Sequence, residues 1–505
     1  MSVGAITQGP AIAASSVETK FRRGLWVATA LSALALLSYC GTMLWAENSF
    51  SGPESVVAAQ AMMLAHDGTL YYDLNQYPYT VCAYMPIFYF LDAGLIKLGL
   101  PAFLAGRLIS FVALLGLIAM ARLLVLLYTE NRTSAWMAAI LVASSSLLGS
   151  WGSVGQVDTL AIFFAVTAFY YYSRFHLRGE STLLAAGIFS ALAIFTKQTA
   201  VAAPAAIFML LAFRDRKKAL WFGGLLGGGL MLAVPAINAA LHGRFLANTV
   251  LANVNPFSGA KLLVQLQYAG SVCGGLLVVV IASFGKSIRG RGMAPCVYLG
   301  FAVAVFLATA AKIGSDTNYQ IELVVLLAVC TAIGLHEAEF FPLYFGKSKS
   351  WITLLLLPVT VHVAVGLRVA VNMTTARVLT EKVTQSQIND LRPHVTSTGG
   401  LVLSTDYNAM VRLRGRMDVE PLIYQLLVGA KVIDPEPIRR DLERAAFSTV
   451  ILSEDVQGQQ FNNPEIATLV PSQIEEVRKH YRMVQHIAGP YLDGIYVYKP
   501  RSDAD

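Results

Sequence analysis

Residues 104–127 read LAGRLISFVALLGLIAMARLLVLL, and this stretch decides the class of the protein. Only two charged side chains, Arg107 and Arg122, interrupt its apolar residues. A helix of about 20 apolar residues crosses the hydrocarbon core of a bilayer. The stretch therefore predicts a transmembrane helix, with Arg107 close to one end of it.

Similar stretches recur along most of the chain. Of its 505 residues, 55% are hydrophobic and 14% are charged, whereas a soluble protein carries about 25% charged residues. We therefore expect a polytopic membrane protein with about eleven spans. The expected spans are roughly 24–45, 104–127, 134–151, 158–173, 181–197, 199–213, 219–241, 264–284, 293–311, 319–336 and 351–371.

Basic loops predict the orientation of these spans. Strong cytoplasmic markers are residues 214–218, 286–291 and 347–349, and weaker ones are residues 22–23 and 174–178. The net charge of +7 therefore reflects membrane orientation and does not indicate nucleic-acid binding.

One further apolar segment, from Tyr84 to Leu98, is too short for a span. We interpret it as an interfacial helix on the outer surface. The odd number of spans that remains places the N-terminus inside and the C-terminal region outside.

The predicted domains follow from this scheme. Residues 1–23 form a cytoplasmic tail, residues 24–374 form the transmembrane domain with a large outer loop at 46–103, and residues 375–505 form a soluble domain. In the last region, residues 401–404, 449–452 and 495–498 are typical of strands, and residues 377–391, 436–446 and 471–482 are typical of helices. The expected fold class is mainly α, a helical bundle with a small C-terminal α/β extracytoplasmic domain.

Three carboxylates on the expected outer side are candidates for catalysis. Glu54 follows Pro53 at a helix start, where a carboxylate gains from the helix dipole; it either caps the helix or acts as a general base. Asp158 opens an apolar helix, so it is either an ordinary cap or a ligand for a substrate hydroxyl or a divalent ion. Asp73 lies in the same outer loop as Glu54 and is the third candidate.

Cations occur near the same face. Lys197 joins two apolar segments with almost no loop, so it either extends to the lipid headgroups or neutralises a phosphate. Arg107 has the same two interpretations, and Lys312 adds a further polar group. The five cysteines have no metal-ligand spacing, so no metal site is expected from them.

These residues resemble those of the polytopic GT-C glycosyltransferases, which use polyprenyl-phosphate-linked sugars. The resemblance extends to the group of dolichyl-phosphate-mannose-protein mannosyltransferases and aminoarabinose transferases, and it covers most of residues 24–371. The motifs occur in family order: Pro53-Glu54, Gly68-Thr69-Leu70-Tyr71 with Asp73, Tyr84-Met85-Pro86, Gly106-Arg107-Leu108, Gln156-Val157-Asp158, Thr196-Lys197-Gln198 and Asn318-Tyr319.

The resemblance implies an inverting transfer in which an acidic residue of the first outer loop acts on the acceptor and polyprenyl phosphate leaves. Glu54 matches that position, but many relatives have Asp where this chain has Pro53. If the first carboxylate is the base, either Glu54 reaches further or Asp73 or Asp158 shares the role. Glu54, Asp158 and Lys197 are then expected to line one pocket. The implied substrate-binding residues are Arg107, Gln156, Lys197, Lys312, Asn318 and Tyr319, with Arg107 and Lys197 on the lipid phosphate.

The same resemblance implies the partners and the location. They are a polyprenyl-phosphate sugar donor, a lipid, glycan or protein acceptor, and membrane lipid, without nucleic acid. Some relatives use a divalent cation, such as Mg²⁺ or Mn²⁺, but no residue pattern here establishes one. The expected location is a prokaryotic plasma (inner) membrane, with multiple spans.

Two other functions remain open. A transporter or flippase of a lipid-linked substrate would carry polar or broken helices near the midplane, often in paired repeats, and the chain shows no such repeat. A non-catalytic assembly subunit would tolerate any change at Glu54.

Overall fold

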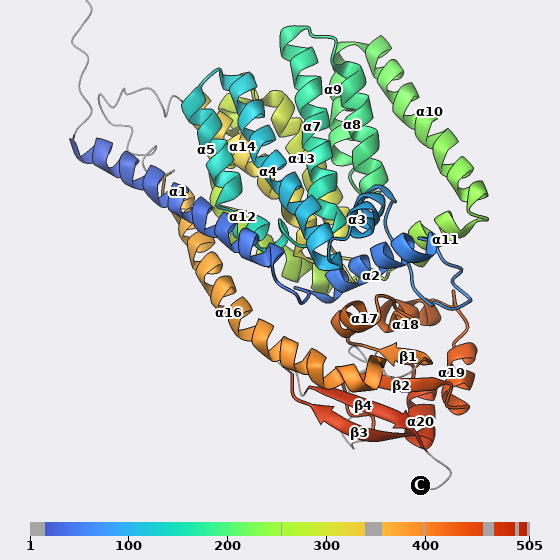
Figure 1. The fold of residues 1–505 in the computed structure, drawn as a ribbon. Helices are drawn as coiled ribbons and strands as arrows, with labels where there is room; N and C mark the ends of the chain where they lie inside the picture. Colours follow the sequence, from blue (N-terminus) through green and yellow to red (C-terminus); the bar gives the residue numbers. More distant parts are fainter. Residues whose placement is uncertain are drawn as a thin grey trace, which may run out of the picture.

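The computed structural model describes residues 16–253, 255–338, 356–396, 399–457, 469–489 and 494–501. A bundle of long helices lies on one side of the molecule, and a smaller α/β domain lies below it (Figure 1). The bundle helices are α1 (Ser16–Leu44), α4 (Ala102–Thr129), α5 (Arg132–Ala143), α6 (Ser146–Trp151), α7 (Val157–Arg178), α8 (Leu183–Thr196), α9 (Ala202–Arg214), α10 (Arg216–Ala240), α12 (Gly259–Ser287), α13 (Met293–Thr309), α14 (Ile321–Glu337) and α16 (Leu356–Thr396).

The expected fold class is confirmed, but the expected number of spans is not. Among the described residues, six helical segments are long and apolar enough to cross a bilayer, within α1, α4, α10, α12, α14 and α16, so the chain is an integral membrane protein. Helices α5, α8, α9 and α13 are apolar but shorter. The expected span 134–151 is interrupted between α5 and α6. The basic loop 347–349 and the first residues of the span 351–371 lie outside the described residues.

Helix α14 is the centre of the bundle and α10 is at its edge. In the apolar window of α14, 89% of the residues are buried, whereas 6% are buried in α10. Figure 1 shows α10 at the periphery, beside α8 and α9. Since lipid replaces protein around α10, its exposed apolar side chains need no protein partner.

A layer of short helices separates the bundle from the C-terminal domain (Figure 1). It contains α2 (Gly52–Asp67), α3 (Ile87–Lys97), α11 (Arg244–Thr249) and the 3₁₀ turn η1 (Leu251–Asn253). Ser51 caps α2 by accepting the Glu54 N–H, and Pro53 occupies its first turn. Helix α3 falls within the segment expected to be interfacial, and its 11 residues are too few to cross a bilayer.

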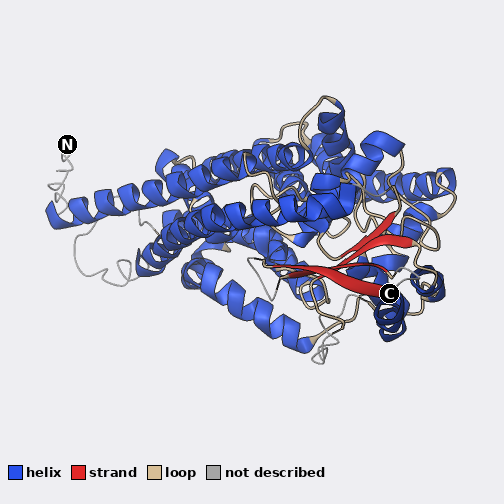
Figure 2. Ribbon diagram, turned by 60° about the horizontal axis from the view of Figure 1, so that its bottom comes forward, coloured by secondary structure: helices blue, strands red, loops and turns tan. Residues whose placement is uncertain are grey.

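The C-terminal domain contains a four-stranded sheet in the order β1-β2-β4-β3 (Figure 2). Strand β1 is parallel to β2, and the other neighbours are antiparallel. The strands are β1 (Leu401–Ser404), β2 (Phe447–Leu452), β3 (Tyr481–Ile487) and β4 (Ile495–Pro500), and the helices are α17 (Tyr407–Leu413), α18 (Pro421–Gly429), α19 (Glu436–Glu443) and α20 (Pro471–His480). The three expected strands are present, and β3 is an additional edge strand.

Helix α16 and residues 46–103 both connect this domain to the bundle. Helix α16 runs without a break from its apolar half to the sheet, across the domain boundary expected near residue 375. The outer loop also pairs with the domain, because the Tyr79 N–H donates to the Asp418 carbonyl at 3.0 Å and the Glu420 N–H donates to the Tyr79 carbonyl at 2.9 Å. The domain therefore lies directly against residues 46–103, which carry the candidate residues Glu54 and Asp73.

Candidate functional site

A small polar cavity lies at one end of the bundle, where α7 and α14 begin and α8 ends. Its volume is about 30 Å³, which is room for one or two water-sized groups. Its polar lining residues are Asp158, Lys197, Thr199, Thr309, Asn318, Tyr319 and Glu322. A phosphosugar is larger than this cavity, so the lining has to move for a whole donor head group to enter.

A buried ion pair lies in this cavity. Asp158 is the second residue of α7, and Lys197 directly follows α8. Lys197 Nζ lies 2.5 Å from Asp158 Oδ1, and both side chains are almost inaccessible to solvent. The same ammonium lies 3.9 Å from the centre of the Tyr319 ring, whose electron-rich face attracts a cation. The pair and the ring together hold the lysine away from the headgroups.

Two acceptor oxygens in the cavity lining lack a hydrogen-bond partner within the described part of the chain. They are Asp158 Oδ2 and Asn318 Oδ1, and both residues are buried. Glu322 lies beside them and accepts a hydrogen bond from the Tyr298 hydroxyl at 2.5 Å. Buried polar groups without a partner are costly and often mark a ligand or water site. The cavity is therefore suited to a group that donates hydrogen bonds.

Close packing fixes the start of α7. Gly155, which precedes it, packs against Gly106 of α4, and a Cβ atom on Gly106 would lie 3.2 Å from the Gly155 Cα. Any side chain at Gly106 would thus push the two backbones apart. The Ser110 hydroxyl also donates to the Gln156 carbonyl at 3.2 Å. Helix α4 thereby sets the position of Asp158.

Glu54 forms a second buried ion pair, outside the cavity lining. Its Oε1 accepts from Arg107 Nε at 2.8 Å and from the Gly155 N–H at 3.0 Å, and its Oε2 accepts from Arg107 Nη2 at 2.9 Å and from the Phe50 N–H at 2.6 Å. Burial alone raises the pKa of Glu54, but the Arg107 guanidinium and the N–H groups of Gly155 and Phe50 hold this pKa below its usual value. Both oxygens are thus engaged by donors.

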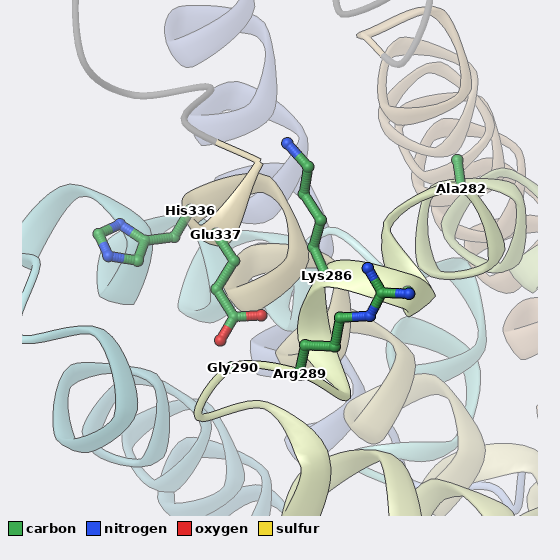
Figure 3. Close-up of a pocket in the computed structure, with 7 residues that line it drawn as sticks. Ala282, Lys286, Arg289, Gly290, His336 and Glu337 are labelled. Atoms are coloured by element: carbon green, nitrogen blue, oxygen red, sulfur yellow. The ribbon is translucent and has the colours of Figure 1, made fainter.

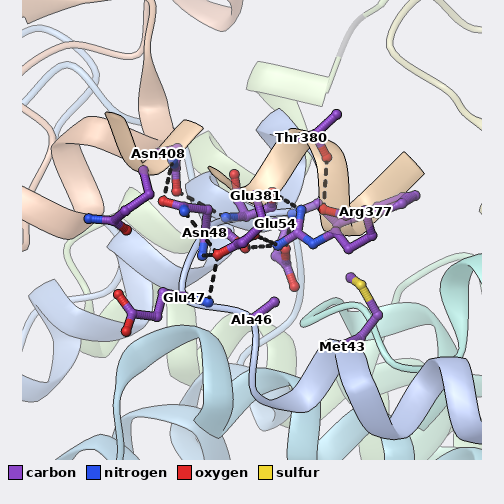
Figure 4. A network of polar contacts seen from close by, with 12 residues as sticks. Met43, Ala46, Glu47, Asn48, Glu54, Arg377, Thr380, Glu381 and Asn408 are labelled. Carbon is purple, nitrogen blue, oxygen red and sulfur yellow. Dashed lines mark hydrogen bonds and ion pairs between the residues drawn. The ribbon is translucent and has the colours of Figure 1, made fainter. Parts of the chain in front are cut away.

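Arg107 also organises the loop at residues 46–50, which we call the 46–50 loop; Figure 4 shows Ala46, Glu47 and Asn48 of this loop beside Arg377 and Glu381. The guanidinium donates to the carbonyls of Ala46 and Asn48. Arg377 of α16 donates to the carbonyls of Asn48 and Ser49. The loop is thus fixed between one arginine of the bundle and one arginine of the helix that enters the C-terminal domain.

The expectation that Glu54, Asp158 and Lys197 line one pocket is therefore wrong for this structure. The cavity brings together Asp158, Lys197, Asn318 and Tyr319, as expected, while Glu54 is outside its lining and accepts from the N–H of Gly155, three positions before Asp158. The physical reason is that the Arg107 guanidinium offers Glu54 two charge-assisted hydrogen bonds within the protein.

The remaining expected residues lie outside the cavity lining. Asp73 accepts from the Asn75 N–H at 3.0 Å, which is a local turn contact. Lys312 is half-buried and pairs through its backbone with Phe257. Gln156 is buried beside Asp158, and its Nε2 lacks a partner within the described residues. Glu322 was not expected from the sequence. The signal that could have identified it is that it is a single acidic residue near the end of an apolar span.

A larger hollow lies at the opposite end of α14 (Figure 3). Its volume is about 750 Å³, and its lining includes Lys286, Arg289, His336 and Glu337. Figure 3 shows Lys286 and Arg289 extending in different directions. Because these charges do not converge on one point, the smaller cavity is the better candidate for chemistry.

The cavity does not fit a divalent cation well. Among the described residues, no three His, Cys, Asp or Glu side chains gather at one point. Asp158 and Glu322 supply two carboxylates. The Lys197 ammonium lines the same cavity and contacts Asp158, so it would repel a divalent cation there.

Comparisons with known proteins agree with this architecture. Residues 77–238 match the family model of dolichyl-phosphate-mannose-protein mannosyltransferase, which is about a third of the chain. Among curated proteins, none matches the chain.

The fold is similar to those of solved membrane proteins. ArnT from Cupriavidus metallidurans, bound to undecaprenyl phosphate, is 12% identical with a TM-score of 0.63, and the match covers 94% of this chain and 98% of ArnT. Its apo structure gives a TM-score of 0.65 at 11% identity, over 96% and 98% of the two chains. The Archaeoglobus fulgidus oligosaccharyltransferase gives 0.57 at 14% identity, over 95% of this chain and 74% of its own. These likenesses show a shared fold across nearly the whole chain.

Proposed function

We propose that this chain is a GT-C membrane glycosyltransferase that moves a sugar from a polyprenyl-phosphate donor to an acceptor at the non-cytoplasmic face. The observation that carries the proposal is the buried Asp158–Lys197 pair in a cavity where Asp158 Oδ2 and Asn318 Oδ1 lack partners. Its support from relatives is that ArnT binds undecaprenyl phosphate and that the Archaeoglobus fulgidus enzyme AglB binds dolichol phosphate with an inhibitory peptide.

The proposed reaction is a direct displacement at the anomeric carbon. The acceptor hydroxyl oxygen forms a bond to that carbon, the bond from the carbon to the phosphate oxygen breaks, and polyprenyl phosphate leaves with the electron pair. Asp158 Oδ2 takes the acceptor proton because it is a buried carboxylate oxygen of the cavity that no donor engages among the described residues. One displacement inverts the anomeric configuration.

In this mechanism the remaining candidates have separate roles. Lys197 supplies positive charge for the departing phosphate, because an ammonium has two N–H donors beyond the one that contacts Asp158. Glu54, which the family resemblance assigns as base, instead positions Gly155 and thereby Asp158. In many relatives an acidic residue occupies the position of Pro53. This chain lacks that carboxylate, and we assign the role of base to Asp158 instead.

The proposed location is a prokaryotic plasma membrane, with residues 375–505 outside. The basic loops 214–218 and 286–291 support this orientation, because they lie at the ends of the bundle helices away from the cavity. A lipid-linked donor would then reach the cavity from the outer leaflet.

The test is sugar transfer by the purified full-length protein in liposomes, with a panel of radiolabelled polyprenyl-phosphate sugars and acceptor extract. We expect transfer by the wild type and a loss of at least about 100-fold in kcat for Asp158→Asn. Lys382→Ala, at an exposed position of α16, is the control and should keep full activity. Movement of the lipid-linked sugar across the liposome without transfer would instead identify a transporter.

A further inference from the structure

We propose that Asn318 and Glu322 form a subsite that recognises one hydrogen-bond-donating substituent of the donor sugar, a hydroxyl or an amino group. This inference rests on the proposed function and identifies which part of the substrate the α14 side of the cavity binds. Both residues line the cavity, and both are buried. Glu322 then acts as a specificity-determining residue, although it lies in an otherwise apolar helix.

The polarity of the cavity carries the first step. Acceptor oxygens on its walls are Asp158 Oδ2, Asn318 Oδ1 and the Glu322 carboxylate. The principal donor, Lys197, already contacts Asp158, and the Thr309 hydroxyl donates to the carbonyl of Val305 in its own helix. Because Asp158 Oδ2 and Asn318 Oδ1 are buried without a donor among the described residues, a ligand group that donates hydrogen bonds satisfies them, whereas a phosphate oxygen does not.

The size of the cavity carries the second step. A volume of about 30 Å³ admits one or two groups of the size of a hydroxyl or an amino group but not a sugar ring. The subsite formed by Asn318 and Glu322 therefore contacts a substituent of the sugar, while the sugar ring stays outside it. A site that hydrogen-bonds a substrate hydroxyl rejects an analogue without it strongly, because its own polar groups are left unpaired.

The carboxylate is held in place for this role. The Tyr298 hydroxyl of α13 donates to Glu322 Oε1 at 2.5 Å, and Tyr298 itself is completely buried. Asn318 is fixed by the 3₁₀ turn η2 (Thr317–Gln320), whose start is capped by the side chain of Asp316. Preorganised acceptors lose little freedom when the substituent binds. Tyr298 is thus a positioning residue for Glu322.

The experiment measures equilibrium binding to the full-length protein in nanodiscs. The probes are bare polyprenyl phosphate, the same lipid carrying a hexose, its single-deoxy analogues and an amino-sugar analogue. We expect the wild type to bind one hydroxylated or amino donor at least about tenfold more tightly than the matching deoxy donor. Glu322→Gln and Asn318→Leu should reduce this ratio to near one without changing the affinity for the bare lipid.

Controls keep the inference separate from the proposed function. Glu322→Gln should weaken an amino donor more than a hydroxyl donor, because it removes the negative charge, whereas Asn318→Leu should weaken both. Tyr298→Phe should give an intermediate ratio, and thermal unfolding identifies any variant that fails to fold. Equal binding of all sugar-loaded lipids by the wild type, or equal loss of bare and loaded lipid in both variants, overturns the subsite. Selective binding without sugar transfer overturns the proposed glycosyltransferase function and leaves the subsite standing. Absence of binding to every lipid overturns both the proposed function and the subsite.

Discussion

Lys197 Nζ lies 2.5 Å from Asp158 Oδ1, across residues that are 39 positions apart in the chain. Removing one member of a buried ion pair leaves an uncompensated charge, at a cost of about 3–5 kcal/mol, whereas replacing both members costs much less. We expect Asp158→Asn and Lys197→Met each to lower the thermal unfolding midpoint clearly. The double variant Asp158→Asn/Lys197→Met should recover most of that loss but no sugar transfer.

The measurement is thermal unfolding of the four proteins in one detergent, together with transfer activity. A double variant as unstable as the sum of the single variants would mean that the two residues do not interact energetically.

A separate prediction concerns Glu54 and Arg107. Glu54 accepts four hydrogen bonds, two of them from the Arg107 guanidinium. A glutamine in its place would direct its own N–H groups toward some of these N–H donors, which it cannot pair with. We expect Glu54→Gln to lower the free energy of unfolding by about 3–5 kcal/mol as well as the activity. Arg107→Met added to Glu54→Gln should restore part of the stability.

Urea unfolding followed by tryptophan fluorescence checks this expectation. Unchanged stability of Glu54→Gln together with complete loss of transfer would instead make Glu54 the base. A fully active and stable Glu54→Gln would favour the assembly-subunit hypothesis.

The 46–50 loop supplies the third prediction. Arg377 donates to the carbonyls of Asn48 and Ser49, and Glu381 accepts from the Asn48 N–H at 3.2 Å (Figure 4). We expect Arg377→Ala to raise hydrogen exchange of the loop at least about tenfold, because opening it then breaks fewer contacts. Lys382→Ala is the matched control on the same helix. Equal exchange in both variants would contradict the role of Arg377.

The fourth prediction is a pH dependence that comes from Glu420. This buried carboxyl of the C-terminal domain contacts the Val81 N–H, and its burial raises its pKa to about 8. A raised pKa in the folded state adds stability at low pH, and this contribution is lost as the pH rises from about 4.5 to about 8. We expect wild type to lose stability relative to Glu420→Gln over that window, on the order of 3 kcal/mol. Parallel pH profiles of the two unfolding midpoints would contradict this.

Much of the fold was predictable because single segments determine it. The apolar run 104–127 became α4, since length and hydropathy are local properties. Strand β3 was missed because its central residues are mostly exposed, so its pattern shows no alternation of apolar and polar side chains. The break between α5 and α6 was also missed, although Ser144 and Ser145 mark it.

The candidate site was predictable only in part. Asp158, Lys197 and Asn318 share the end of the bundle that the basic loops define as outer, so topology alone brought them together. The pairing of Glu54 with Arg107 depends on how α2 packs on α4, which no local pattern specifies. Glu322 was overlooked for a related reason, because whether a lone acidic residue faces lipid or a cavity depends on the rotation of its helix.

Helix α16 connects the transmembrane bundle to the C-terminal domain as one continuous helix. Its 41 residues form one α-helix, roughly 60 Å long. A change in the tilt of its apolar half within the lipid would therefore shift its C-terminal end, next to the sheet, by several ångströms. Thinner or thicker bilayers alter the tilt of such helices. We therefore expect turnover to peak at one acyl chain length when the protein is reconstituted in a series of phosphatidylcholines. Turnover that does not depend on acyl chain length would show that the tilt of α16 does not affect the site.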